Sequence, residues 1–146
     1  MNRLRIYLAA PLFSDAERAY NAALAEALER RVEVFLPQRD GDLVPDLIAA
    51  GLDIQSAFRK IFEKDLEAIR TCDLLVAVLD GRVVDEGVAV ELGYAHAISK
   101  PCWALKTDPR SLSRFGDNPM IEMIIGRKFD TLAALLEAVL VVEFDT

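Results

Sequence analysis

Apolar and polar positions along the chain follow two patterns: short unbroken apolar runs, and longer segments with an apolar residue every three or four positions. The first pattern is typical of buried strands and the second of amphipathic helices. Unbroken runs predict strands over Arg5–Ala9, Val32–Leu36, Asp73–Leu79, Pro101–Lys106 and Arg127–Phe129. Helical spacing predicts long helices over about Asp15–Arg30, Ile54–Arg70, Val88–Ser99 and Thr131–Val142.

Shorter signals fill the gaps between these segments. Asp46–Ala50 predicts one helical turn. Asn118 can cap a short helix over about Pro119–Ile125, because asparagine is a favoured N-cap and proline a favoured first helical residue. Polar residues with glycine or proline predict loops over residues 38–42 and 107–116.

Strands therefore alternate with helices along the whole chain. This order is typical of a parallel sheet with helices on both faces. The Asp73–Leu79 run is the most apolar strand, so we expect it at the centre of the sheet, buried on both faces. The sequence predicts an α/β fold in a single domain over residues 1–146: a flavodoxin-like (Rossmann-like) doubly wound sheet of about five parallel strands.

Composition narrows the classes of function. A length of 146 residues fits one domain, and 53% apolar residues suffice for a core. The net charge of −7 argues against a nucleic-acid partner, which requires a basic surface. No apolar run approaches the ~20 residues that span a bilayer, so we expect no membrane partner. The stretch before Ser14 loosely imitates a signal peptide, but it is short and predicts a first strand instead.

Few residues are suited to metal or redox chemistry. Cys72 and Cys102 lack the CxxC spacing of a metal or disulfide motif, and we expect two buried thiols in a cytoplasmic protein. His96 is the only histidine, which leaves little basis for a histidine metal cage or a Ser-His-Asp triad. These residues therefore give little basis for a metal site.

Polar residues gather where the predicted strands end. Because the carboxyl ends of parallel strands meet at one edge of the sheet, these side chains are expected to line one pocket. Such a pocket suits a polyhydroxylated or heterocyclic ligand. Neither GxGxxG nor GxxxxGK[ST] is present, so nothing in the sequence calls for a phosphate. The residues in question are Tyr7, Gln38, Asp80, Asp85, Glu91 and Asn118.

Two carboxyl groups are candidates for glycosidic-bond chemistry. Glu91 lies near the start of a predicted helix among apolar and small residues, which disfavours a purely solvated role. A glutamate there can attack a sugar anomeric carbon, and Asp65 can protonate the leaving group. Other readings stay open, since Asp65 also fits a solvated or capping position and Asp80 a turn.

Five segments resemble the nucleoside 2-deoxyribosyltransferase family, in the order in which that family carries them. The most specific is DEGVAVELGYAHA at residues 85–97. The others are IYLAAPLFS at 6–14, FLPQRD at 35–40, KDLEAIRTCDLLVAVLDG at 64–81 and DNPMI at 117–121. The resemblance implies a pentosyltransferase of nucleoside salvage that moves 2-deoxyribose from a 2′-deoxynucleoside to a free nucleobase, without cofactor or metal.

The resemblance also implies catalytic roles. Glu91 matches the nucleophile that forms a deoxyribosyl-enzyme intermediate, and Asp65 matches the aspartate that protonates the base. Tyr7 matches the tyrosine that positions the nucleophile. Family members often end with an aromatic residue whose terminal carboxylate enters the site, whereas this chain ends in 144–146, FDT.

The substrate-binding residues follow in the same way. Asp85 matches the aspartate that holds the sugar 5′-hydroxyl, and Gln38 matches a residue that contacts the base. Asn118 matches an asparagine that a neighbouring subunit donates to the 5′-hydroxyl, which implies a homo-oligomer of at least two subunits. Phe13 and Asp80, which follow the first and third predicted strands, complete the predicted substrate-binding set.

Alternatives remain open at this point. Deoxynucleoside 5′-monophosphate N-glycosidases of the same superfamily carry a Gly/Ser/Arg-rich loop after the first strand and a serine near the Asn118 position. This chain has AAPLFS and Asn118, which favours a 5′-hydroxyl over a phosphate. A hydrolase of unphosphorylated 2′-deoxynucleosides would keep the same residues, and a non-catalytic nucleoside sensor would need the pocket without Glu91.

Overall fold

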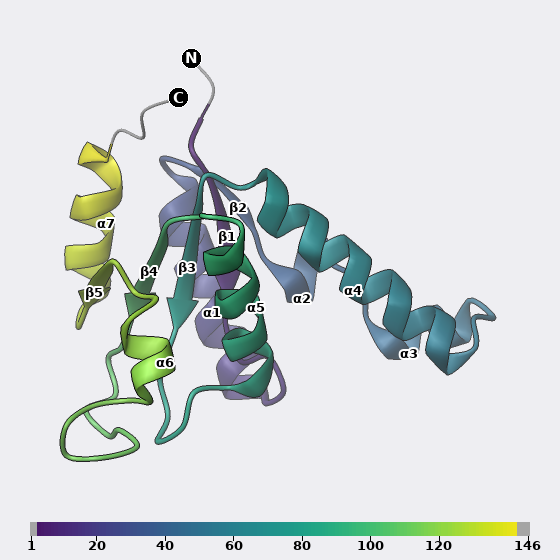
Figure 1. Cartoon of the computed structure of the whole chain (residues 1–146). Helices are drawn as coiled ribbons and strands as arrows, with labels where there is room; N and C mark the ends of the chain where they lie inside the picture. Colours follow the sequence, from purple (N-terminus) through teal and green to yellow (C-terminus); the bar gives the residue numbers. More distant parts are fainter. Residues whose placement is uncertain (1–2, 143–146) are drawn as a thin grey trace.

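The structure, a computed structural model, describes residues 3–142. The C-terminal segment 143–146, with the terminal carboxylate, lies outside the described residues. Figure 1 shows strands and helices alternating along the chain. The strands are β1 Arg5–Ala9, β2 Glu33–Phe35, β3 Leu74–Val78, β4 Cys102–Leu105 and β5 Arg127–Phe129. The helices are α1 Asp15–Glu29, α2 Pro37–Asp40, α3 Val44–Ala49, α4 Ile54–Thr71, α5 Glu86–Ala97, α6 Pro119–Glu122 and α7 Leu132–Val141.

The strands form one parallel sheet in the order β2-β1-β3-β4-β5, which confirms the predicted fold class. All five residues of β3 are buried, as expected for the central strand. The chain reverses its direction of travel across the sheet between β1 and β3. Doubly wound folds bind ligands at this switch point, beyond the carboxyl ends of the strands.

Helices cover both faces of the sheet, because alternate residues of each buried strand point to opposite sides. Ile6 and Leu8 of β1 pack in a cluster with apolar residues of α1 and α7. Tyr7 and Ala9 pack on the other face with residues of α4 and α5. Figure 1 shows α5 and α1 on opposite sides of the sheet. The second face therefore brings Tyr7 against the helix that follows β3.

Helix α4 extends beyond the sheet and carries α3 on its outer half (Figure 1). It begins at the N-cap Asp53, whose Oδ1 accepts a hydrogen bond of 3.0 Å from Ser56 N. The apolar stripe expected from the sequence is only partly covered. Ala57 is fully buried, whereas Phe58 and Phe62 remain 51% and 57% exposed. The outer half of α4 thus presents a row of uncovered aromatic side chains.

Two short segments differ from the expectation. The predicted loop at 38–42 begins inside α2, where Pro37 occupies the first turn and the carboxylate of Asp40 accepts a 2.8 Å hydrogen bond from Leu36 N. The predicted helix after Asn118 ends at Glu122 rather than near Ile125. The turn predicted at Asp46–Ala50 belongs to helix α3, which ends at Ala49 and is followed, after its C-cap Ala50, by Gly51 with a φ of +97°.

Both cysteines are free and buried, as the sequence predicts. Within residues 3–142, no helix is long and apolar enough to cross a bilayer. The same residues contain no group of three or more histidine, cysteine, aspartate or glutamate side chains placed to hold a metal ion.

Candidate active site

Two side chains from distant parts of the sequence meet on the face of the sheet covered by α4 and α5. Tyr7 projects from the middle of β1, is completely buried, and stacks on the Phe35 ring at a centroid distance of 5.5 Å. Its phenol donates a 2.7 Å hydrogen bond to Oε1 of Glu91, in the second turn of α5. Strand β1 and the helix after β3 therefore hold this carboxyl group in one orientation.

Asp65 of α4 supplies a second carboxyl group to the same cavity. The cavity has a volume of about 330 Å³ and lies between α3, α4 and α5. Oδ1 of Asp65 is buried and has no hydrogen-bond partner among the described residues. Apart from Asp65 and Glu91, the wall is apolar: Val44, Phe58, Ile61, Phe62, Leu66, Gly87 and Val90.

Burial perturbs both carboxyl groups. It raises the pKa of Glu91 to about 8, helped by the charges of Asp65 and Asp85 and opposed by the hydrogen bond from Tyr7. Burial likewise raises the pKa of Asp65 to about 6. Between these values the pair holds about one proton, as coupled carboxyl groups do. Because the pKa of Glu91 is the higher of the two, this proton rests mostly on Glu91, and the arrangement with Glu91 ionised and Asp65 protonated is the less populated one.

Asp85 ends the loop after β3 and caps α5. Its Oδ2 accepts a 3.1 Å hydrogen bond from Val88 N. A Cβ added at Gly87 would lie 3.1 Å from the same oxygen, so glycine leaves space beside the carboxylate. Asp85 is half-buried and close enough for its charge to raise the pKa of Glu91. It is thus placed near the cavity, with a second oxygen not used in capping.

Gln38 lies in α2, which follows β2, and Phe13 lies in the segment between β1 and α1. Gln38 donates to Arg18 O over 2.9 Å, and its Oε1 accepts a 3.0 Å hydrogen bond from Asn21. Asn21 is 1% exposed and also donates to Pro11 O over 2.8 Å. The Phe13 side chain is 73% exposed. Hydrogen bonds within the chain therefore fix the Gln38 amide. Asn21 was not identified from the sequence as its partner, although a polar residue among the apolar positions of a helix is a sign of a buried polar contact.

Asp80 has a structural role. Its carboxylate accepts hydrogen bonds from Thr107 N at 2.6 Å, Thr107 Oγ1 at 2.7 Å and Asp108 N at 3.0 Å. These bonds bind the loop after β3 to the loop after β4. They fit the turn role that the sequence left open, and we propose no substrate contact for Asp80.

Asn118 lies outside the cavity that contains Glu91. It caps α6, where its Oδ1 accepts a 2.9 Å hydrogen bond from Met120 N. It lines a second cavity of about 390 Å³ with residues of α5 that do not line the first, Ala89 and Gly93. Within one chain, therefore, Asn118 and Glu91 serve different cavities.

Fold and site together define the class of protein. A doubly wound sheet is combined with an oriented glutamate and a half-buried aspartate with a raised pKa. Paired carboxyl groups of this kind are the machinery of glycosidic-bond enzymes.

The comparisons identify the family within that class. A sequence model described as nucleoside 2-deoxyribosyltransferase matches residues 6–136, and the chain belongs to this family. A nucleoside deoxyribosyltransferase of Limosilactobacillus fermentum is 27% identical over 80% of this chain and 73% of its own. A Thermofilum pendens protein, provisionally assigned as 2′-deoxynucleoside 5′-phosphate N-hydrolase 1, is 32% identical over 70% of this chain and 67% of its own. The 2-deoxyribosyltransferase structure of Leishmania mexicana superposes with a TM-score of 0.66 at 26% identity, covering 94% of this chain and 98% of that one.

Proposed function

We propose that this protein transfers 2-deoxyribose between nucleobases through a covalent intermediate on Glu91. The carboxylate of Glu91 attacks C1′ of a 2′-deoxynucleoside, and the bond from C1′ to the base breaks as Asp65 gives its proton to the leaving base. An acceptor base then attacks C1′ of the deoxyribosyl ester, frees Glu91 and returns a proton to Asp65. Atoms and charge balance over the two halves.

The contact between Tyr7 and Glu91 carries this proposal. The 2.7 Å hydrogen bond holds the glutamate at the wall of a cavity whose other carboxyl group, Asp65, has an unpartnered buried oxygen. A nucleophile needs a fixed orientation, and an acid needs a raised pKa. Both requirements are met within one cavity of about 330 Å³.

A 5′-hydroxyl suits the site better than a 5′-phosphate. The segment after β1, Ala10–Ser14, contains no glycine that would bring backbone amides close to a phosphate. Asp85, a carboxylate near the cavity, would repel a phosphate and accept a hydrogen bond from a hydroxyl. We infer that 2′-deoxynucleosides are donors and free nucleobases acceptors. Buried free thiols at Cys72 and Cys102 support a cytoplasmic location for such salvage chemistry.

Hydrolysis is the second candidate function, and the likeness to the Thermofilum pendens protein favours it. Water replacing the acceptor base at C1′ would use the same two carboxyl groups. The test is incubation with deoxyinosine, with and without adenine. Deoxyadenosine formed only with adenine supports transfer, whereas free deoxyribose in equal amounts under both conditions would establish the hydrolase and refute the transferase.

We expect a bell-shaped pH dependence of kcat/KM with limbs near pH 6 and pH 8. Below pH 6 both groups are protonated and Glu91 cannot attack, whereas above pH 8 both are ionised and Asp65 cannot protonate the base. Between these limits the single proton rests mostly on Glu91, whose pKa is the higher, so the productive form with Glu91 ionised and Asp65 protonated is a minor population. Initial rates at subsaturating deoxyinosine between about pH 4 and pH 10 would measure the limbs. A rate that stays constant through this interval would show that the two groups do not share the proton.

We propose that the active form is an oligomer in which Asn118 serves the cavity of a neighbouring subunit. Asn118 is exposed, and it does not reach the cavity of its own Glu91. Two uncovered apolar surfaces support association: Phe58 and Phe62 beside the catalytic cavity, and Met120 and Met123 beside Asn118, with exposures of 51%, 57%, 75% and 82%. Joining the two surfaces would close the cavity and bring in the Asn118 amide.

Shared sites predict that two inactive variants restore each other. In a two-fold dimer, a mixed pair of Glu91→Gln and Asn118→Ala subunits contains one intact site and one doubly defective site. Random pairing therefore restores about one quarter of the wild-type sites. Co-expression of differently tagged chains and assay of the purified mixture would measure this recovery.

The matched control replaces either partner by the double variant Glu91→Gln/Asn118→Ala, which can supply no missing group. Each control mixture is expected to stay inactive. Recovery in a control, or none in the test mixture while mixed oligomers form, would place Asn118 outside the neighbouring site.

A further inference from the structure

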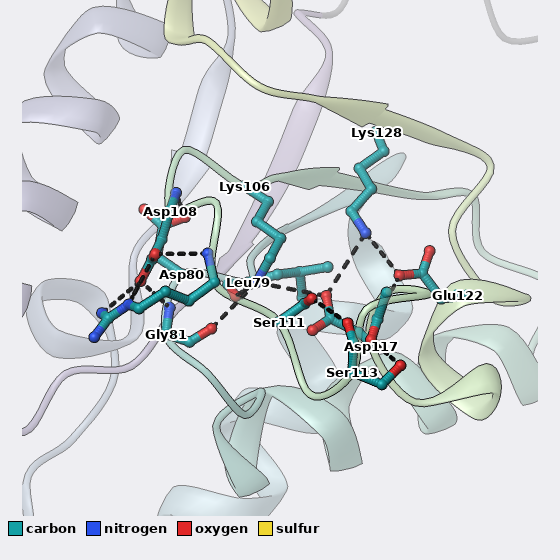
Figure 2. Close-up of polar contacts among 12 residues, drawn as sticks. Leu79, Asp80, Gly81, Lys106, Asp108, Ser111, Ser113, Asp117, Glu122 and Lys128 are labelled. Atoms are coloured by element: carbon teal, nitrogen blue, oxygen red, sulfur yellow. Dashed lines mark hydrogen bonds and ion pairs between the residues drawn. The ribbon is translucent and has the colours of Figure 1, made fainter.

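Lys106 stands at the junction of two loops that both lead to substrate-binding candidates (Figure 2). It follows β4, and its side chain is only 9% exposed. The ammonium group donates to Leu79 O at 2.9 Å and to Gly81 O at 3.2 Å, on either side of Asp80. It also lies 3.5 Å from Oδ2 of Asp117. The ammonium group therefore makes two hydrogen bonds to the loop after β3 and one ion pair with the loop after β4.

A reciprocal clamp reinforces the junction. While Asp80 accepts from the backbone of Thr107 and Asp108, the Asp108 carboxylate accepts a 3.2 Å hydrogen bond from Gly81 N. The loop after β3 and the loop after β4 are thus tied in both directions. Because Gly81 has a φ of +112°, which favours glycine, the turn that presents its carbonyl to Lys106 depends on that residue.

Asp117 joins Lys106 to Asn118. Its side chain is 2% exposed, and neither carboxylate oxygen has a hydrogen-bond partner among the described residues. Its charge is balanced by Lys106 at 3.5 Å and Lys128 at 3.6 Å, as the dashed lines of Figure 2 mark. The backbone of Asp117 donates to Glu122, which also binds Lys128 at 2.8 Å. An ion pair with the buried ammonium group of Lys106 therefore holds Asp117, the residue before Asn118, in place.

Both loops tied by Lys106 reach the residues that hold the sugar 5′ end under the proposed function. The loop after β3 runs from Gly81 to Asp85, and the loop after β4 runs to Asn118. Val83 and Val84 of the first loop line the same cavity as Asp117 and Asn118 of the second. A displacement of either loop at Lys106 would thus be transmitted over a few residues to a group that binds substrate.

We propose that Lys106, acting through Asp117 and the carbonyl groups of Leu79 and Gly81, is a positioning residue for recognition of the 5′-hydroxyl. It fixes Asp85 for the site of its own subunit and Asn118 for the site of a neighbour. One ammonium group therefore sets the geometry of two active sites. This inference rests on the proposed function, because it takes from there the 5′-hydroxyl contacts of Asp85 and Asn118.

A purely stabilising role would make a different prediction. Buried ion pairs contribute little net stability, since desolvation offsets their attraction, and an apolar side chain of equal length often replaces them without loss. Positioning depends instead on the geometry of the three contacts. A displacement of about 1 Å at a binding group can lower turnover about a hundredfold, and only for substrates that use that group.

The test is Lys106→Met, assayed with 2′-deoxyadenosine and with 2′,5′-dideoxyadenosine as donors. The wild-type enzyme is expected to prefer the donor with the 5′-hydroxyl. In the variant, kcat/KM for 2′-deoxyadenosine should fall about tenfold to a hundredfold, and that for the 5′-deoxy donor by less than about threefold. The ratio of the two values, which general loss of folded protein does not change, is the measured quantity.

Lys100→Met is the matched control. Lys100 is also a partly buried lysine that ties neighbouring segments, donating to Cys72 O at 2.6 Å, but it precedes β4 at the opposite edge of the sheet. Its replacement should leave the preference for the 5′-hydroxyl unchanged. An unchanged preference in Lys106→Met, or an equal loss of preference in Lys100→Met, would overturn the proposal.

A second variant keeps the proposal testable if Lys106→Met does not fold. Lys106→Met leaves the Asp117 carboxylate buried with Lys128 as its remaining cation, so Lys106→Met/Asp117→Asn removes both charges together. The double variant should show the same collapse of preference, and retention of the wild-type preference would count against positioning. A wild-type enzyme that uses both donors equally would refute the 5′-hydroxyl contacts of the proposed function, and the inference with them.

Discussion

Replacing Glu91 by glutamine is expected to abolish turnover and leave the protein folded. An amide cannot form the ester with C1′, so we expect kcat/KM for 2′-deoxynucleosides to fall at least about 10⁴-fold. Glutamine has nearly the same shape and can still accept the hydrogen bond from Tyr7, which spans 2.7 Å in the wild-type chain. The assay is transfer of deoxyribose from deoxyinosine to adenine, followed by chromatography.

The same variant should be more stable than the wild type in alkaline solution. The pKa of Glu91 is raised from 4.5 to about 8 in the folded protein, so folding favours the neutral carboxyl group. The stability that this group contributes is full below pH 4.5 and is lost as the pH rises through about 8. Glutamine stays neutral throughout, and we expect its Tm at pH 9 to exceed that of the wild type by at least about 3 °C.

Glu86→Gln provides the control, because Glu86 belongs to the same helix but is exposed in its first turn. Its replacement should change neither turnover nor the pH dependence of Tm appreciably. Retained transferase activity in Glu91→Gln would exclude the covalent intermediate. A Tm lower than that of the wild type at pH 9 would mean that folding stabilises the ionised form of Glu91, contrary to the raised pKa.

Replacing Asp65 by asparagine is expected to remove acid catalysis while sparing the nucleophile. The neutral purine is a poor leaving group until protonated, so kcat/KM for deoxyinosine should fall about 10²–10⁴-fold. A 4-nitrophenyl 2-deoxyriboside leaves as a stable phenolate without a proton, and its release should change by less than about threefold. The ratio of the two losses measures the contribution of proton donation by the Asp65 carboxyl group, whose raised pKa of about 6 suits this task.

Glu63→Gln, at an exposed position of the same helix, is the matched variant and should leave both substrates unaffected. Equal losses for the purine and nitrophenyl donors in Asp65→Asn would indicate a role in binding or folding. In that case another group would have to protonate the base.

Local hydrophobic patterns in the sequence predict most of the strands and helices. The apolar run 74–79 predicts the central strand because only a strand covered on both faces tolerates so many consecutive apolar residues. Helix α2 could not be predicted, since its four residues, Pro37–Asp40, lack a helical apolar period. The helix instead depends on Pro37 in its first turn and on the Asp40 carboxylate, which bonds back to Leu36 N.

The candidate site was less accessible to sequence reasoning than the fold. The resemblance implies the pairing of Tyr7 with Glu91, and the structure brings these side chains into contact although 84 positions separate them. The internal bonds of Gln38 and Asp80 were not predictable, because their partners lie 17 and 27 positions away. The sequence predicts Lys106 only as the end of a strand, and nothing in the local sequence indicates that its ammonium group contacts two loops.

The two exposed aromatic side chains of α4 have a consequence for how activity depends on protein concentration. Phe58 and Phe62 line the cavity that contains Glu91 and Asp65, and they remain about half exposed in the single chain. If a second subunit covers them, association and formation of a closed site are one equilibrium. The turnover rate per subunit would then decline when the enzyme is diluted below the dissociation constant of the oligomer. Substrate, by bridging the two subunits, would lower that threshold.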